Sequence, residues 1–172
     1  MKVQKPGFTL IELLIVIAII GLLSAIGVAY FSGAQRQARD TKRLNDIKSL
    51  QEGISIYFHE KAIFPDITSG NTWDGDLASD LANYLSQMPM DPDDSAGEEY
   101  IYVVDNANHN QMYVVATLEE DDAQALTQDV DGTISGSGWE SLSSQDIFVP
   151  SASSATIDCN DPVFCLHVDA SF

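Results

Sequence analysis

No lysine or arginine occurs after Lys61 in this chain of 172 residues. Residues 62–172 contain 21 acidic residues and account for most of the formal net charge of −18 at pH 7. Proteins bind the phosphates of nucleic acids mainly through lysine and arginine, so we expect no direct nucleic-acid binding by this region. Its acidity indicates a well-solvated surface that resists aggregation, and cation binding is the alternative interpretation.

The chain also lacks the short motifs that mark common active sites. It contains no nucleophile elbow, no glycine-rich phosphate loop and no zinc-binding helix motif. Its three histidines, His59, His109 and His167, lie in unrelated sequence contexts. The sequence therefore predicts a protein without enzymatic activity.

Proline is absent between Phe8 and Phe64, and residues 8–31 carry a single charged side chain, that of Glu12. A helix rises about 1.5 Å per residue, so this apolar run is long enough to cross the roughly 30 Å hydrocarbon core of a bilayer. We expect a membrane span or a secretory signal rather than a buried core helix, because soluble domains seldom place so long an apolar run at the N-terminus.

A conventional secretory signal is the main alternative to a membrane span. Lys2 and Lys5 form a basic N-terminal region, and Gly27-Val28-Ala29 fits the small-residue pattern of a cleavage site. Against this alternative, Glu12 interrupts the apolar region near its start, and the helical pattern continues past Ala29.

The residues at the start of the apolar run match a known family. The string Lys-Pro-Gly-Phe-Thr-Leu-Ile-Glu at positions 5–12 resembles the signature of type IV pilins and of the related pseudopilins of type II secretion. The resemblance implies that a prepilin peptidase at the cytoplasmic face cleaves between Gly7 and Phe8. It further implies removal of residues 1–7 as a leader, N-methylation of Phe8, and a role for Glu12 as the acidic residue of the family.

Phe8 and Glu12 are the predicted assembly residues. After cleavage Phe8 would carry an ammonium group, and a carboxylate in an apolar environment is tolerated chiefly when it is paired. If subunits stack side by side with an axial offset, Glu12 of one can meet the Phe8 amine of its neighbour. The cost of placing Glu12 in lipid then favours assembly.

Residues 32–61 continue the helical pattern in amphipathic form. Apolar residues recur at helical spacing and predict one buried stripe: Ala34, Ala38, Leu44, Ile47, Leu50, Ile54, Tyr57 and Phe58. Charged residues are expected on the other faces: Arg36, Arg39, Asp40, Lys42, Arg43, Asp46 and Lys48. They either shape the surface through weak pairs such as Asp40 with Arg43 or form a basic band that meets the acidic heads of neighbouring subunits. With the apolar run, they predict one continuous helix of about fifty residues, which ends before Pro65.

Residues 62–172 are predicted to form an acidic globular head, which gives an α+β, type IV pilin-like fold with the long helix packed on a small antiparallel sheet. Residues 68–71 are expected to be a loop, followed by a short helix over about 76–87. Two strand candidates, 99–105 and 111–118, flank a turn-prone connector and predict a hairpin. Residues 127–146 are expected to be a long surface loop, and short strands are expected around 146–149 and 163–168.

Two further segments of the head bear on the family. Residues 88–92, Met-Pro-Met-Asp-Pro, and the Tyr-Ile-Tyr at 100–102 are similar to elements before the sheet in major pseudopilins and many small pilins.

Cys159 and Cys165 are the only cysteines in the sequence. An even pair in an exported domain predicts a disulfide, with two free thiols as the alternative.

Calcium is the one cofactor that the sequence suggests. Asp129 begins a segment that resembles a calcium loop, but Ile134 stands where an EF-hand requires glycine. Major pseudopilins bind calcium in the head, and the resemblance implies that a looser site could use Asp129 and Asp131, or Asp91, Asp93 and Asp94.

The sequence thus predicts a structural subunit of a type IV pilus. Monomers are expected to wait in the inner membrane as single-pass proteins and to polymerise with identical and related subunits into an extracellular filament. The implied partners are the peptidase, the assembly platform and the assembly ATPase. A type II secretion pseudopilin is the alternative within the family, and a membrane-tethered acidic binding module is the alternative outside it.

Overall fold

The computed structural model describes residues 7–67, 72–93, 100–105, 111–120, 124–135, 139–143, 148–149, 156–160 and 162–169. The chain divides into two compact units, residues 1–37 and residues 38–172. The second unit contains the predicted head and also residues 38–61, and from here on the head is this whole unit, residues 38–172.

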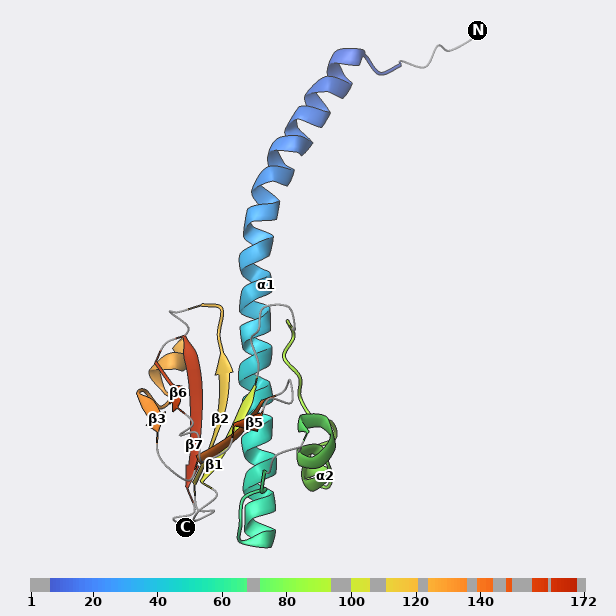
Figure 1. Ribbon diagram of the computed structural model, residues 1–172. Coiled ribbons are helices and arrows are strands. Elements are labelled where there is room, and N and C mark those ends of the chain that lie inside the picture. Colours follow the sequence, from blue (N-terminus) through green and yellow to red (C-terminus); the bar gives the residue numbers. More distant parts are fainter. Residues whose placement is uncertain are drawn as a thin grey trace. The chain divides into compact units, whose positions relative to one another are not determined.

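The long helix α1 spans Leu10–Lys61 and contains 52 residues, which confirms the predicted continuous helix (Figure 1). It ends at Ala62, whose φ of 60° is left-handed and whose N–H donates to the carbonyl oxygen of Phe58 at 2.7 Å. A left-handed residue just after the last turn is a common helix stop, although glycine usually occupies it. Pro65 follows within the next turn and cannot continue a helix.

The head contains a five-stranded antiparallel sheet in the order β5-β4-β1-β2-β7. Its strands are β1 (Ile101–Asp105), β2 (Gln111–Thr117), β4 (Trp139–Ser143), β5 (Phe148–Val149) and β7 (Val163–Asp169). The pairing of β1 with β2 confirms the predicted hairpin; its connector lies outside the described residues. A second sheet pairs β3 (Thr133–Ser135) with β6 (Thr156–Asp158).

Both faces of the central strands are buried, which explains why β1 and β2 read as nearly continuous apolar runs. One face packs with α1 in the main core, whose strand residues are Tyr102, Val104, Met112, Val114, Ala116, Leu142, Phe164 and Val168. The other face packs in a smaller core with the two-stranded sheet, formed by Val103, Val115, Ile134, Cys159 and Cys165. The sheet is therefore the middle layer of the head.

Residues 38–61 of α1 supply part of the main core. The predicted stripe is buried at Ile47, Leu50 and Ile54 and partly buried at Leu44, Tyr57 and Phe58. Ala34 and Ala38, which the predicted stripe also included, are exposed. The head core therefore begins on α1 and not at residue 62.

Three predictions about the head are wrong in detail. The short helix begins as a π-helical turn, Trp73–Leu77, and continues as α2, Ala78–Leu81, so it starts and ends earlier than 76–87. Residues 127–146 contain β3, β4 and the end of the 3-10 turn Gln124–Thr127, so they are not a single loop. Strand β6 was not predicted. The predicted loop at 68–71 lies outside the described residues.

Candidate assembly site

Helix α1 begins with a reciprocal cap between Thr9 and Glu12. The Glu12 Oε2 atom accepts hydrogen bonds from the backbone N–H and from the hydroxyl of Thr9, both at 2.8 Å. In return, the Glu12 N–H donates to Thr9 Oγ1 at 3.3 Å. This arrangement is a capping box, which satisfies backbone donors that the first turn of a helix leaves unpaired. It also holds the carboxylate at the positive end of the helix dipole.

Residues Gly7 and Phe8 lie immediately before this cap. Phe8 is 90% exposed, and the space around Gly7 is open, since a Cβ at this position would have no neighbour within 4 Å. The predicted cleavage bond therefore lies in an exposed segment outside the helix. The pairing of Glu12 with the Phe8 amine of another subunit stays a prediction.

The apolar part of α1 is exposed in the single chain wherever its side chains are described. Large apolar side chains between Leu10 and Leu23, and those of Tyr30 and Phe31, are at least about half exposed. By length and composition α1 qualifies as a helix that could cross a membrane. Its exposed apolar surface requires lipid or other protein around it.

Sequence reasoning missed the role of Thr9. The available signal was Thr9 followed three residues later by Glu12, the Ser/Thr-x-x-Glu pattern of a capping box directly before an apolar run. That pattern gives Glu12 a partner within its own chain.

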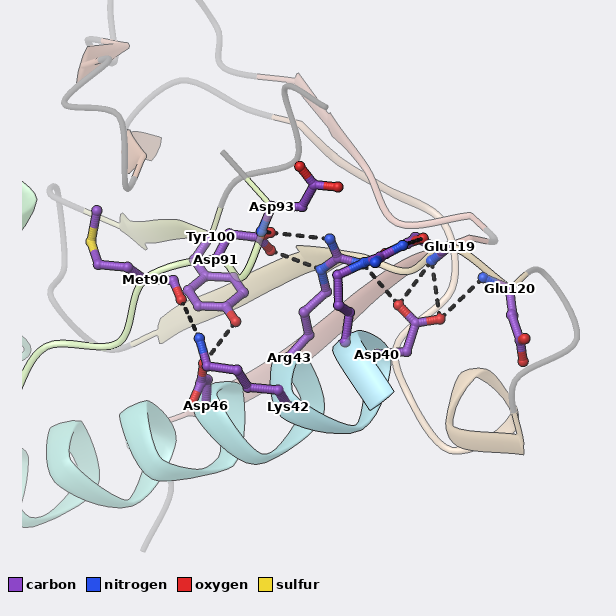
Figure 2. A network of polar contacts seen from close by, with 11 residues as sticks. Asp40, Lys42, Arg43, Asp46, Met90, Asp91, Asp93, Tyr100, Glu119 and Glu120 are labelled. Atoms are coloured by element: carbon purple, nitrogen blue, oxygen red, sulfur yellow. Dashed lines mark hydrogen bonds and ion pairs between the residues drawn. The ribbon is translucent and has the colours of Figure 1, made fainter. Parts of the chain in front are cut away.

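A second polar constellation lies inside the head, around Arg43 (Figure 2). The guanidinium is fully buried, and it donates to both carboxylate oxygens of Asp91, from Nε at 2.8 Å and from Nη2 at 3.0 Å. Its Nη1 atom donates to Asp40 at 2.8 Å and to Glu119 at 3.0 Å. Because buried charges are stable only when paired, this network fixes residues 91 and 119 to α1.

Asp40 and Arg39 complete the network at the end of β2. The Asp40 carboxylate accepts hydrogen bonds from the backbone N–H groups of Glu119 and Glu120 at 3.0–3.2 Å. Arg39 forms an ion pair with Glu119. The hydrogen bond from Arg39 is the main reason that the pKa of Glu119 lies below its ordinary value of 4.5. Burial opposes this effect, and the hydrogen bond from Arg43 adds a smaller lowering.

The network corrects the prediction that the charged residues of 32–61 lie on the outer faces of the helix. Asp40 and Arg43 are buried, and Arg39 is engaged within the chain. Lys42 donates to the carbonyl oxygen of Met90 at 2.9 Å and lies 3.6 Å from Asp46. Much of the predicted basic band is thus used to hold the head together.

The candidate calcium ligands do not form a recognisable site in the described part of the chain. No group of three or more His, Cys, Asp or Glu side chains there is arranged to hold a metal ion. Both oxygens of Asp91 are bound by Arg43, and Asp129 Oδ2 accepts the backbone N–H of Cys165 at 3.0 Å. Asp131 is exposed, and Asp94 lies outside the described residues. As arranged, Asp91, Asp129 and Asp131 do not fit a calcium ion, and calcium binding through the other candidate residues stays a prediction.

Cys159 and Cys165 form the predicted disulfide, which is buried in the smaller core. Hydrogen bonds place both cysteines against the segment that enters β3. The Cys159 N–H donates to the carbonyl oxygen of Gly132 at 2.7 Å, and the carbonyl oxygen of Cys165 accepts the N–H of Val130 at 3.1 Å. The disulfide therefore ties the two-stranded sheet to β7.

Comparisons with known proteins agree with the architecture. A family model described as "Prokaryotic N-terminal methylation motif" matches residues 4–28. A fimbrial protein of Pseudomonas aeruginosa is 32% identical over 127 residues, which cover 73% of this chain and 75% of that protein. Type II secretion system core protein G of Escherichia coli (strain K12) is 26% identical over 135 residues, 74% of this chain and 90% of that protein.

A shorter match is to a type IV major pilin. The type IV major pilin protein PilA of Myxococcus xanthus is 38% identical over 66 residues, 38% of this chain and 30% of that protein. No solved structure gives a significant match. With the methylation motif, the long N-terminal helix and the antiparallel sheet, these similarities show that the chain belongs to the family of type IV pilins and type II secretion pseudopilins.

Proposed function

We propose that this protein is a structural subunit of a type IV pilus. The observation that carries the proposal is the 32% identity to a fimbrial protein over 73% of this chain, which extends well beyond the N-terminal helix into the head. The acidic head supports the same conclusion, because a charged, solvated surface suits the outside of an extracellular filament.

In this proposal the N-terminus carries the chemistry of assembly. A prepilin peptidase cleaves after Gly7 and methylates the new amine of Phe8. In the single chain, Glu12 is held by Thr9. In the filament, the carboxylate also pairs with the Phe8 amine of a neighbouring subunit, which removes an unpaired charge from an apolar environment.

The cellular route follows from the same residues. The subunit waits in the inner membrane through residues 8–31, with its head on the outer side. The assembly platform and its ATPase then move it into an extracellular filament, where the exposed apolar side chains of α1 pack against those of other subunits.

A type II secretion pseudopilin is the second candidate. The observation that favours it is the match to core protein G of Escherichia coli, which covers 74% of this chain and 90% of that protein. The two candidates share leader cleavage and polymerisation. They differ in whether the filament appears on the cell surface.

Two measurements test the proposal. Mass spectrometry of the mature protein should show an N-methylated Phe8 at the N-terminus; a start at Tyr30 would indicate a secretory signal instead. Deletion of the gene should remove surface filaments that contain this chain and leave protein secretion unchanged. Lost secretion with no such filaments would establish the pseudopilin role.

Deletion of the peptidase addresses the binding-module alternative. A filament subunit should then keep residues 1–7 and fail to polymerise. A tethered binding module should bind its ligand as well as before.

A further inference from the structure

Few large apolar side chains are exposed on the head. Among its described residues, only Ile56, Ile63 and Met90 are, at 48%, 46% and 41%. Ile56 and Met90 line the same groove, whereas Ile63 lies just beyond the end of α1. Over the described residues of the head, the exposed large apolar side chains are therefore divided between one groove and one projecting residue.

The groove runs along α1 and has a cavity volume of about 580 Å³. One wall is helical and includes Glu52 and Ile56, and the other is the segment Tyr84–Met90. Leu85 packs against Gly53 between the walls, so closely that a Cβ at position 53 would lie 2.8 Å from the Leu85 Cγ. This volume is typical of pockets that bind a small molecule, so the groove is large enough to hold a side chain of another protein.

The projecting residue is Ile63, and the backbone places it. Ala62 adopts a left-handed conformation with φ of 60°, which ends α1 and turns the chain. Phe64 is then buried in the main core while Ile63 remains exposed. Exposed Lys61 precedes this turn, so an apolar and a cationic side chain lie together at the end of the helix.

Each surface offers one exposed charged side chain whose sign is opposite to that on the other surface. Glu52 is exposed on the groove and Lys61 is exposed beside Ile63. Neither forms an ion pair with another side chain in the described part of the chain. Since no lysine or arginine follows Lys61 in the sequence, the helix is the only source of a cation for contacts between copies of the head.

We propose that Lys61 and Ile63 of one copy bind the groove of a second copy of this chain, with Ile63 against Ile56 and Met90 and with Lys61 paired to Glu52. The proposal rests on the proposed role as a filament subunit and assigns a contact between heads. The two surfaces are different, so the contact is heterologous and can repeat along an open filament, whereas a self-complementary contact would stop at a dimer.

Cysteine cross-linking of the full chain tests the contact. The double variant Ile63→Cys, Met90→Cys should give a ladder of disulfide-linked multimers when filaments are oxidised. The control pair Ile63→Cys, Lys48→Cys should not, because Lys48 is exposed on α1 but does not line the groove. The native cysteines are buried and paired, so they should not take part.

A charge exchange tests the ion pair. Lys61→Glu should lower the yield of filaments about two- to five-fold, as expected for loss of one exposed ion pair per contact. Lys61→Arg should keep the yield, and combining Lys61→Glu with Glu52→Lys should restore it. Thiol labelling of membrane-held monomers should show that Cys159 and Cys165 still pair, which controls for folding of the head.

The outcomes separate the two proposals. Wild-type filaments without a ladder from positions 63 and 90, or with a cross-link that stops at the dimer, would overturn this contact and leave the filament role intact. A normal yield from Lys61→Glu would also overturn it. Failure of the wild-type chain to form any filament would instead overturn the proposed function.

Discussion

Arg43 and Asp91 lie 48 residues apart in the sequence and form a buried, two-pronged ion pair in the head. The guanidinium also bonds Asp40 and Glu119, so three carboxylates converge on one cation, and Arg39 supplies a second. Since the partners come from α1, from the segment before β1 and from the end of β2, the network determines how the sheet is attached to the helix.

Replacement of Arg43 should strongly destabilise the head. Arg43→Met removes the cation and leaves buried carboxylates unpaired, which typically costs about 3–5 kcal/mol. We expect a loss of this size in the free energy of unfolding of the detergent-solubilised chain, measured by urea titration. Lys48→Met is the matched control, because Lys48 is exposed on the same helix, and it should change stability by about 0.5 kcal/mol or less. Equal effects of the two substitutions would contradict the role of the network.

Acid should destabilise the head through Glu119. Its pKa is held below 4.5 by Arg39, so the folded state binds this proton less readily than the unfolded state. A carboxyl of this kind stabilises the fold above its unfolded pKa, and that stability is lost as pH falls through the folded pKa. Melting temperature should therefore fall as pH drops below about 4.5. Glu119→Gln should be less stable at pH 7 and should show a smaller further loss in acid.

Asp80 provides a control, because its pKa is shifted in the opposite direction to that of Glu119. Burial and the nearby Asp76 and Asp66 raise its pKa, so protonation of Asp80 favours the folded state. Asp80→Asn should increase the melting temperature at pH 7.

For Glu119, the contradicting outcome is a melting temperature that falls more steeply with acid in Glu119→Gln than in the wild type. That result would mean that Glu119 does not cause the acid effect.

Gly53 should resist replacement by alanine although it lies inside a helix. Alanine normally stabilises a helix by about 1 kcal/mol relative to glycine. Here the new Cβ would lie 2.8 Å from the Leu85 Cγ, and overpacking of this kind costs about 1–3 kcal/mol. We expect Gly53→Ala to lower the free energy of unfolding by about 1 kcal/mol.

A double-mutant cycle separates the two effects. In a Leu85→Ala background the clash is absent, so Gly53→Ala should become neutral or stabilising. The same loss in both backgrounds would mean that contact with Leu85 is not the cause.

Glu12 should be required for assembly but not for membrane insertion. Glu12→Leu removes the carboxylate from the apolar run, so insertion should persist and the yield of sheared filaments should fall at least about ten-fold, as for loss of a charge pair worth roughly 1.4 kcal/mol. Glu12→Gln is the informative companion, because glutamine can still form the capping box with Thr9 but carries no charge. Wild-type yield from Glu12→Gln would show that the cap, not the charge, is what assembly requires.

The long helix and the hairpin could be predicted because their signals are local. The apolar run of 8–31 and the helical spacing of Ile47, Leu50 and Ile54 both predict α1, and Pro65 marks its end. Strands β1 and β2 are rich in valine and tyrosine, which favour strands.

The missed features depend on partners far away in the sequence. β3 and β4 are short and polar, and their conformation comes from pairing with β6 and β1. The burial of Arg43 could not be read from α1 alone, because an Arg beside an Asp on a helix is usually a solvent-exposed pair. It becomes buried only when Asp91 and Glu119 are in place.

The long sequence separation between Arg43 and its partners Asp91 and Glu119 imposes an order on folding. Residues 38–61, which include Arg43 and its partner Asp40, are synthesised before Asp91 and Glu119, which complete the network and lie 48 and 76 residues beyond Arg43. Contacts between such distant residues form slowly. The head half of α1 therefore remains without its sheet until Glu119 has arrived, and attachment of the head is a late event in the maturation of each subunit.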